Sequence, residues 1–178
     1  MVTNIFVTNI FKDRKDAGQF LARRLTKYRN RDDVVVLALP RGGVPVAYEV
    51  AKALNAPLNI FLVGKPGGPE FEEYVCNSLG VTGKTVIVVD DGMVTGSTMR
   101  AAVRALRKKK PRKIVIAVPV GERGVCNSFK HEADTVVICA TMPEPFNALG
   151  TFYRHFAQTT DVEVQQLLRQ VEQTKVAA

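Results

Sequence analysis

The chain has 178 residues, of which 46% are hydrophobic, and a formal net charge of +8. This length predicts one domain over residues 1–178, large enough to bury a core. No apolar run approaches the ~18 residues that a membrane span needs, and the positive charge indicates an anionic partner, either a nucleic acid or a small molecule.

The first eleven residues, MVTNIFVTNIF, repeat the pentapeptide VTNIF. They contain no basic n-region and no small-residue cleavage site, so they do not resemble a signal peptide. We expect a short edge strand or a frayed arm here, without chemistry. The three cysteines, Cys76, Cys126 and Cys139, are widely spaced and form no CxxC pair. This pattern argues against a disulfide framework or a metal finger and predicts a cytoplasmic protein.

Short apolar runs alternate with helical patterns along most of the chain. Such alternation predicts an α/β fold, with a central, mostly parallel sheet of about five strands flanked by helices. Ligands of these sheets bind beyond the carboxyl ends of the strands. The expected strands are 34–39, 58–63, 85–89, 114–118 and 135–139, and the expected helices are 13–28, 44–54, 98–109, 125–131 and 161–171.

The loop DDGMVTGST, residues 90–98, follows an apolar strand and runs into a helix. Its glycines and hydroxyl side chains, placed at a helix N-terminus, are typical of a phosphate cradle. Asp90 and Asp91 can accept hydrogen bonds from a vicinal diol and can help to hold a hydrated Mg²⁺. The loop therefore predicts a phosphorylated sugar as ligand. The alternative is structural, because strand-end aspartates also cap turns. A P-loop and a GxGxxG fingerprint are both absent from the sequence.

The stretch VIVVDDGMVTGSTM, residues 86–99, resembles the ribose-phosphate-pyrophosphate signature of type I phosphoribosyltransferases. LALPRGGVPVA, residues 37–47, resembles the pyrophosphate loop of the same fold. FKDRKDAGQFLARRL near the start and TMPEPFNALGTFYRHFAQ near the end are similar to a bacterial subgroup of predicted phosphoribosyltransferases. The resemblance implies the Rossmann-like fold of this family.

The resemblance also implies roles for the matching residues. Asp90 and Asp91 would contact the ribose 2′ and 3′ hydroxyls and, through water, Mg²⁺. Arg41 would act with this pair in catalysis, on a Pro40–Arg41 peptide that is expected to be cis. The binding residues implied for 5-phosphoribosyl 1-pyrophosphate are Pro40, Arg41, Gly42 and Gly43 around the pyrophosphate, Asp90 and Asp91 on the ribose, and Gly92, Met93, Val94, Thr95, Gly96, Ser97 and Thr98 around the 5′-phosphate.

The reaction that the family resemblance implies is a Mg²⁺-dependent transfer of the phosphoribosyl group. A nitrogen nucleophile, usually a nucleobase, would displace pyrophosphate from C1 of the ribose, as in nucleotide metabolism and nucleoside salvage. Positioning, with stabilisation of the leaving pyrophosphate by Mg²⁺ and Arg41, would provide most of the catalysis. The implied partners are small-molecule substrates, with no membrane. The sequence leaves the oligomeric state open, with a homodimer as the commonest prior.

The sequence departs from the family pattern at two places. Val94 stands where some purine-salvage members carry a third aspartate, so the loop assigns no general base. His155, in the aromatic tail, is a candidate for the site, although a surface or packing role is favoured for it. Residues 64–84 form a reduced hood, too short for the usual lid, and residues 141–178 form a C-terminal tail and helix. A short hood puts turnover and the choice of base in question.

The sequence offers several candidates for further contacts to the base or to phosphate. The aromatic candidates for stacking on a base are Phe146, Phe152 and Tyr153, with packing of the tail as the alternative. Lys65 and Arg123 are candidates for a phosphate or the base, and a solvated role is the alternative for Lys65.

A regulator that senses phosphoribosyl pyrophosphate or nucleotides, and binds RNA, is the alternative function. The basic run RALRKKKPRK, residues 104–113, favours it, although such a run usually marks only a solvated helix end. A phosphate-ester hydrolase is a weaker alternative, because the sequence has no Ser-His arrangement or DxD loop.

Overall fold

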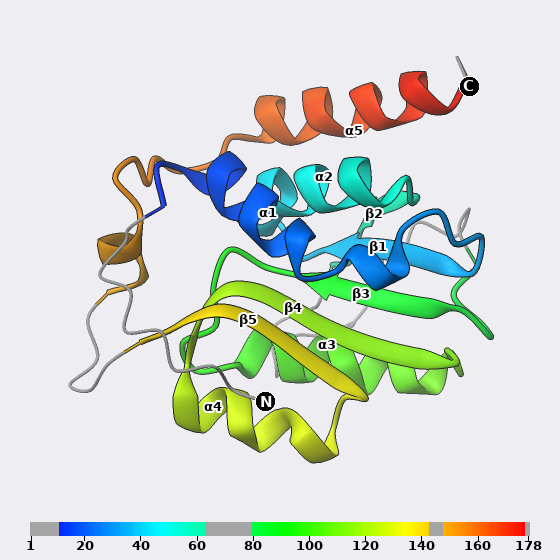
Figure 1. Ribbon diagram of the computed structural model, residues 1–178, viewed down its shortest axis with the longest axis horizontal. Coiled ribbons are helices and arrows are strands. Elements are labelled where there is room, and N and C mark those ends of the chain that lie inside the picture. Colours follow the sequence, from blue (N-terminus) through cyan, green and yellow to red (C-terminus); the bar gives the residue numbers. More distant parts are fainter. Residues whose placement is uncertain (1–10, 63–79, 143–147, 177–178) are drawn as a thin grey trace, which may run out of the picture.

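The computed structural model describes residues 11–62, 80–142 and 148–176, without the side chains of residues 172–176 (Figure 1). Its five strands form one parallel sheet in the order β2-β1-β3-β4-β5, which confirms the predicted α/β, Rossmann-like fold. The strands are β1 (Val34–Ala38), β2 (Leu58–Ile60), β3 (Thr85–Val89), β4 (Lys113–Glu122) and β5 (Thr135–Met142). The N-terminal repeat up to residue 10 and most of the reduced hood lie outside the described residues.

Five α-helices cover the two faces of the sheet. Helices α1, α2 and α5 lie on one face, and α3 and α4 lie on the other (Figure 1). The helices are α1 (Arg14–Arg23), α2 (Gly43–Leu54), α3 (Ser97–Lys108), α4 (Arg123–Ser128) and α5 (Asp161–Val176), with short 3-10 turns η1 (Thr26–Tyr28), η2 (Phe129–His131) and η3 (Leu149–Phe152). Within the described residues, none of these helices is long and apolar enough to cross a membrane.

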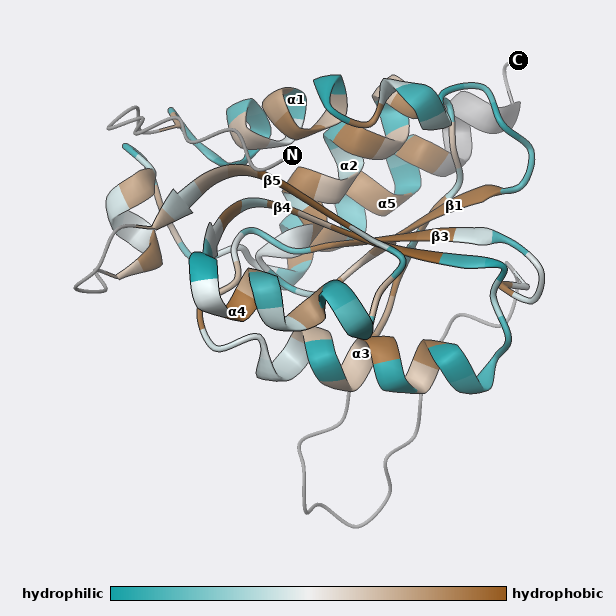
Figure 2. Cartoon of the chain, turned by 60° about the horizontal axis from the view of Figure 1, so that its bottom comes forward, coloured by the Kyte–Doolittle hydropathy of each residue, from teal (hydrophilic) through white to brown (hydrophobic). Residues whose placement is uncertain are grey.

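The core consists of two apolar layers, one on each face of the sheet. Alternate residues of β1 show the division, because Val34 and Val36 pack with α1 and α2 while Val35 and Leu37 pack with α3. Every residue of β1 and β3 is buried, as expected for central parallel strands covered by helices on both sides. Figure 2 shows the brown strands between helices whose outer faces are teal.

The main difference from the predicted elements is the length of β4. The sequence predicts that this strand ends at residue 118, but it continues to Glu122 by pairing with β5. Its last pair with β3 is Val89–Ala117. Pro119, which has no N–H to donate, therefore lies where the β3 ladder has already ended.

The strand order reverses between β1 and β3. After β1 the chain turns to β2 at one edge, whereas β3 is followed by β4 and β5 toward the other edge. The loops that leave the carboxyl ends of β1 and β3 therefore lie at the topological switch point, where ligands of open parallel sheets bind.

Candidate functional site

The two predicted loops lie against each other at the carboxyl end of the sheet. The Leu39 N–H donates to the Val89 carbonyl at 2.9 Å, which fixes the starting points of both loops. A Cβ on Gly42 would overlap the Asp91 carboxylate, and a Cβ on Gly43 would lie 2.8 Å from the Val89 carbonyl oxygen. Only glycine allows this approach. The Pro40–Arg41 peptide is cis, as the family resemblance implied.

The acidic pair is compact and electrostatically unfavourable. The Asp91 N–H donates to Asp90 Oδ1 at 2.8 Å. Burial of the Asp90 carboxyl, followed by the negative charge of Asp91, raises its pKa well above the ordinary value. The side chains of Asp90 and Asp91 also interact with each other. A carboxylate pair of this kind is suited to accept hydroxyls or to face a cation.

The loop that follows the acidic pair returns to the sheet before it enters α3. The Met93 N–H donates to the Val120 carbonyl at 2.8 Å, and the Met93 carbonyl accepts from the Glu122 N–H at 2.9 Å. Gly96 then adopts a left-handed conformation, with φ of 71°, and α3 begins at Ser97 without a side-chain cap. The Ser97 N–H donates to Thr95 Oγ1 at 3.4 Å. The next amides of α3 face the loop, where the helix dipole favours an anion.

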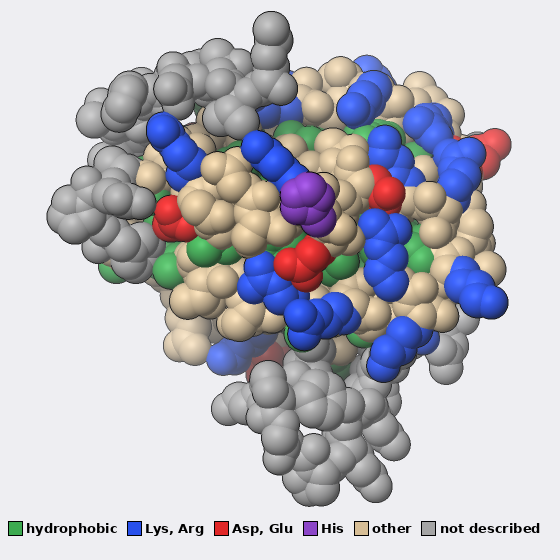
Figure 3. Space-filling view, turned by 90° about the horizontal axis from the view of Figure 1, so that it is seen from below, with side chains coloured by type: hydrophobic (Ala, Val, Ile, Leu, Met, Phe, Trp, Pro, Cys, Tyr) green, Lys and Arg blue, Asp and Glu red, His purple; other side chains and the backbone are tan. Residues whose placement is uncertain are grey.

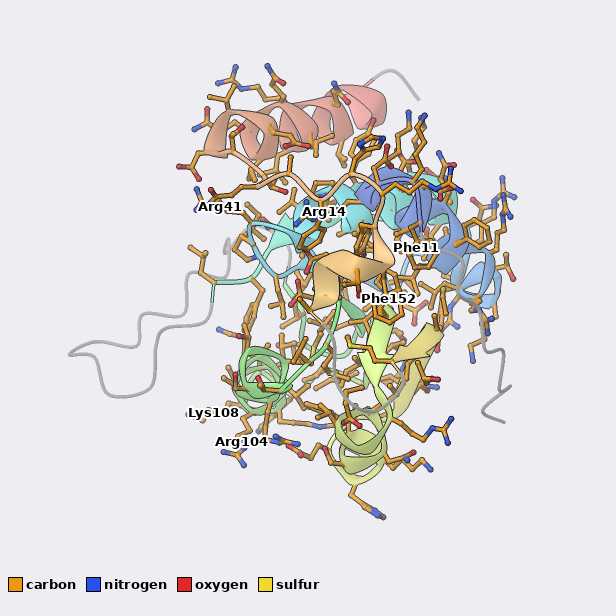
Figure 4. The ribbon with its side chains drawn as sticks, turned by 90° about the vertical axis from the view of Figure 1, so that its left-hand side faces the viewer. Phe11, Arg14, Arg41, Arg104, Lys108 and Phe152 are labelled. Carbon is orange, nitrogen blue, oxygen red and sulfur yellow. The ribbon has the colours of Figure 1, made fainter. Side chains whose placement is uncertain are left out.

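Arg41 lies on the exposed side of the first loop. Its Nη1 atom is 3.5 Å from Asp161 Oδ1, and the side chains are 46% and 80% exposed. An ion pair this long and this exposed contributes little, so Arg41 is available to an anionic ligand. Figure 4 shows Arg41 and Arg14 at the same end of the molecule.

Arg14 is a site residue that the sequence analysis missed. Its Nε donates to Asp91 Oδ2 at 2.8 Å, and its Nη1 donates to the Ala157 carbonyl at 2.6 Å. Its guanidinium carbon also lies 4.0 Å from the centre of the Phe156 ring. One signal was present in the sequence, since Arg14 follows the helix cap Asp13. A cation in the first turn opposes the helix dipole, which indicates a reason other than helix stability.

The tail completes the surroundings of Asp91. Tyr153 is buried, and its hydroxyl donates to the Asp91 carbonyl at 2.5 Å. Its ring stacks on Phe156 and tilts against Phe11. Burial and the charge of Asp91 raise the pKa of Tyr153. Tyr153 is thus engaged in packing the tail onto the site.

The structure places the remaining candidates in different surroundings. Phe152 is half-buried and packs in the cluster that includes Phe11 and Tyr153. Arg123 is exposed at the start of α4, directly after β4. The side chain of His155 is exposed, and its backbone N–H donates to the Lys12 carbonyl at 3.0 Å. Lys65 and Phe146 lie outside the described residues.

The donor set fits a metal that is shared with a ligand. Among the described residues, no three His, Cys, Asp or Glu side chains gather into a metal cluster. Mg²⁺ in phosphate sites is typically held by one or two carboxylates together with substrate oxygens and water. Asp90 and Asp91 are two such carboxylates.

Comparisons with known proteins concern the family and the fold of the chain. A family profile described as "Phosphoribosyl transferase domain" matches residues 7–151. The Mycobacterium tuberculosis (strain CDC 1551 / Oshkosh) protein named "Putative phosphoribosyl transferase MT0597" is 36% identical over 203 aligned positions, which cover 87% of this chain and 45% of that protein. The chain thus spans less than half the length of this curated relative.

Two solved structures are similar in fold. The crystal structure of TT1426 from Thermus thermophilus is 31% identical, covers 90% of this chain and 98% of its own, and superposes with a TM-score of 0.76. A hypoxanthine phosphoribosyltransferase from Staphylococcus aureus superposes with a TM-score of 0.56 at 17% identity, over 81% of this chain and 80% of its own. At this identity the second likeness concerns the fold alone.

Proposed function

The chain belongs to the phosphoribosyl transferase family, and from this premise we propose that it transfers the phosphoribosyl group of 5-phosphoribosyl 1-pyrophosphate to a nitrogen nucleophile. A nucleobase is the proposed acceptor, and pyrophosphate is the second product. The observation that carries the proposal is the contact between the two loops, in which Gly42 and Gly43 back directly onto Asp91 and Asp90. One ligand with a diol and two phosphate groups would touch both loops at once.

Each loop suits a different chemical group of this ligand. The amides at the start of α3, with the exposed hydroxyls of Ser97 and Thr98, suit the 5′-phosphate because they donate hydrogen bonds at the positive end of a helix dipole. Asp90 and Asp91 suit the ribose hydroxyls, which are donors. Arg41 and the backbone of Gly42 and Gly43 suit the pyrophosphate, because a guanidinium presents a fork of donors to phosphate oxygens.

Mg²⁺ is part of the proposal. Asp90 and Asp91 would hold it, through water, together with oxygens of the ligand. When bound, it would neutralise charge on the pyrophosphate and so make it a better leaving group.

The proposed reaction is a substitution at C1 of the ribose. The lone pair of the acceptor nitrogen forms the new C1–N bond while the C1–O bond to pyrophosphate breaks, and the bonding electrons leave with the pyrophosphate oxygen. Arg41 stabilises this growing negative charge. Val94 is apolar and assigns no base in the loop, so the proton of the acceptor nitrogen is assigned to water. Catalysis by this chain is then mainly positioning.

The first test is calorimetric titration with phosphoribosyl pyrophosphate, first with Mg²⁺ and then with a chelator. We expect saturable binding that depends on Mg²⁺ and weakens by about 100-fold or more in Asp90→Asn/Asp91→Asn, the scale expected for misplaced or missing ligand contacts. Asp33→Asn is the matched control, because it removes an aspartate at the opposite end of the sheet. Absence of wild-type binding at millimolar ligand would contradict the proposal.

Turnover is tested separately, by pyrophosphate release with a panel of nucleobases. Release that depends on one base identifies the acceptor. Ligand binding without release for any base would instead favour the regulatory alternative.

One feature of the surface favours that alternative. Arg104, Lys108 and Lys110, around the end of α3, are exposed and form no ion pair among the described residues. Basic side chains gather on this face, seen from below in Figure 3. Such a face can attract RNA through its phosphates. Loss of RNA binding on neutralising Lys108, Lys109 and Lys110, with ligand binding unchanged, would support it.

A further inference from the structure

Arg14 makes three contacts at once, one to the acidic loop and two to the tail. Its Nε pairs with the Asp91 carboxylate at 2.8 Å, its Nη1 reaches the Ala157 carbonyl at 2.6 Å, and its guanidinium covers the Phe156 ring at 4.0 Å. The paired side chains of Arg14 and Asp91 are only 12% and 13% exposed. A guanidinium suits this role because its planar fork can serve two acceptors while its face stacks on a ring.

The position of Arg14 is fixed by the start of α1. Asp13 caps this helix by accepting from the Asp16 N–H at 2.9 Å. Before the helix, the backbone N–H of Phe11 donates to the Phe152 carbonyl of the tail at 2.7 Å. The guanidinium is therefore presented to Asp91 by two anchored backbone segments.

The Asp91 carboxylate has one charged partner that opposes the charge of Asp90. Gly42 closes one side of the carboxylate, and the backbone of Asp91 is held through its carbonyl by Tyr153 and through its N–H by Asp90. These contacts fix the main chain but leave the side-chain torsion to Arg14. Without Arg14, two adjacent carboxyl groups would remain in a half-buried place with no counter-ion among the described residues, and the Asp91 carboxylate would turn away.

We propose that Arg14 is a positioning residue, which holds the Asp91 carboxylate ready for the ribose diol and couples occupation of that site to the placement of the tail at residues 153–157. This inference rests on the proposed function, because it assigns the diol to Asp91. It adds a residue from α1 to a site otherwise built from the loops after β1 and β3. It also explains why the tail crosses the carboxyl end of the sheet at this point.

The test compares two ligands in four proteins. The ligands are phosphoribosyl pyrophosphate, which carries the diol, and inorganic pyrophosphate, which does not, each with Mg²⁺ in a calorimeter. The proteins are the wild type, Arg14→Met, Arg14→Lys and the control Arg23→Met. Arg23 ends the same helix and contacts Phe20 rather than the site, so its removal matches the change in net charge.

For Arg14→Met we expect phosphoribosyl pyrophosphate to bind about 10- to 100-fold more weakly, the usual cost of losing a residue that orients a ligand-binding group. Binding of inorganic pyrophosphate should change less than about threefold, well inside that range. Arg14→Lys should fall between Arg14→Met and the wild type, because a lysine restores the charge but cannot serve both acceptors. Arg23→Met should bind both ligands as the wild type does.

Hydrogen exchange supplies a second readout that a purely structural role would not move. In the wild type, phosphoribosyl pyrophosphate should slow exchange of the amides at residues 153–160. In Arg14→Met, measured at saturating ligand, this protection should be lost, while the protection at residues 92–98 persists.

The outcomes distinguish failure of the proposed function from failure of the role assigned to Arg14. If the wild type binds no phosphoribosyl pyrophosphate, the proposed function fails. If the wild type binds and Arg14→Met binds equally well, the function stands and the role of Arg14 is overturned. Equal weakening of both ligands in Arg14→Met would also overturn it, because general damage to the site would then account for the loss.

Discussion

At the amino end of the sheet, Asp33 lies directly before β1 and accepts hydrogen bonds from Arg31, Thr85 and Arg112. Arg31 alone donates twice, at 3.0 and 2.9 Å. The hydrogen bond from Arg31, aided by the charges of Arg112 and Arg31, lowers the pKa of Asp33 to about 2. At the carboxyl end, Asp90 lies directly after β3 and faces a second carboxylate instead of a cation, and its pKa is raised.

The difference between these ends is instructive because both aspartates adjoin buried parallel strands. The amino end satisfies its carboxylate with arginines and leaves it partly exposed to water. The carboxyl end places two carboxylates together, and within the described residues only Asp91 pairs with an arginine. The Asp90 and Asp91 pair costs folding free energy and lies at the switch point of the sheet, which indicates a binding site. Asp33, which is paired with arginines, indicates a structural role alone.

The largest expected effect comes from Gly42→Ala. The new methyl group would occupy the position of the Asp91 carboxylate and push it away from the ribose site. We expect binding of phosphoribosyl pyrophosphate to weaken by about 100-fold, the cost of misplacing a binding group by about 1 Å. Calorimetry measures the affinity, and circular dichroism checks the fold. Unchanged affinity would mean that the position of Asp91 does not matter.

Gly83→Ala is the corresponding change at the amino end. Gly83 has a φ of +72°, and no atom lies within 4 Å of the position that a Cβ would take. We expect the free energy of unfolding to fall by about 1–2 kcal/mol, because an L side chain disfavours this conformation. Urea unfolding measures this change. Ligand affinity should be unaltered, and any large loss of affinity would show that the two ends are not independent.

Asp90→Asn should stabilise the protein while it weakens ligand binding. Loss of the repulsion with Asp91 should raise the free energy of unfolding by about 1 kcal/mol at pH 7, a typical gain when a strained functional group is replaced. A carboxyl whose pKa is raised on folding contributes stability at low pH and loses it as the pH rises.

The advantage of Asp90→Asn over the wild type should therefore grow as the pH increases above about 4, the pKa of aspartate in an unfolded chain. Urea unfolding at several pH values measures it. A variant that is less stable than the wild type at neutral pH would contradict the interpretation of the carboxyl end as strained.

The smallest effect is expected from Asp33→Asn. A carboxyl with a lowered pKa stabilises the fold above the unfolded pKa, and this stability is lost as the pH falls toward about 2. The melting temperature of the variant should be slightly lower than that of the wild type at pH 7. The difference should disappear in acid and in high salt. Scanning calorimetry measures the difference. A large loss of stability would mean that the exposed pairs at this end matter more than such pairs usually do.

The sequence was sufficient to predict the sheet and its two loops because their signals are local. Apolar runs of β-branched residues identify β1 and β3, and the glycines, aspartates and hydroxyls that follow them lie next to these strands in the chain. The cis peptide before Arg41 followed from the family resemblance alone. The predicted end of β4 was wrong because pairing with β5, which no local pattern reveals, extends it to Glu122.

The support of Asp91 could not be predicted in the same way. Arg14 is separated from Asp91 by 77 residues and Tyr153 by 62, and neither belongs to a motif of the acidic loop. Their contacts depend on how the start of α1 and the tail meet over the sheet. The ion pair of Arg41 with Asp161, 120 residues apart, has the same origin. The roles assigned to individual site residues remain predictions for the experiments above.

The close approach of Gly42 to Asp91 also has a consequence for redesign of the site. No side chain at position 42 has room, because the backbone bond from Leu39 to Val89 sets the separation of the two loops. A new ligand specificity cannot be introduced there one residue at a time. The ring of Phe156, which meets the Tyr153 ring and the Arg14 guanidinium through side chains, is the part that an engineer can change first.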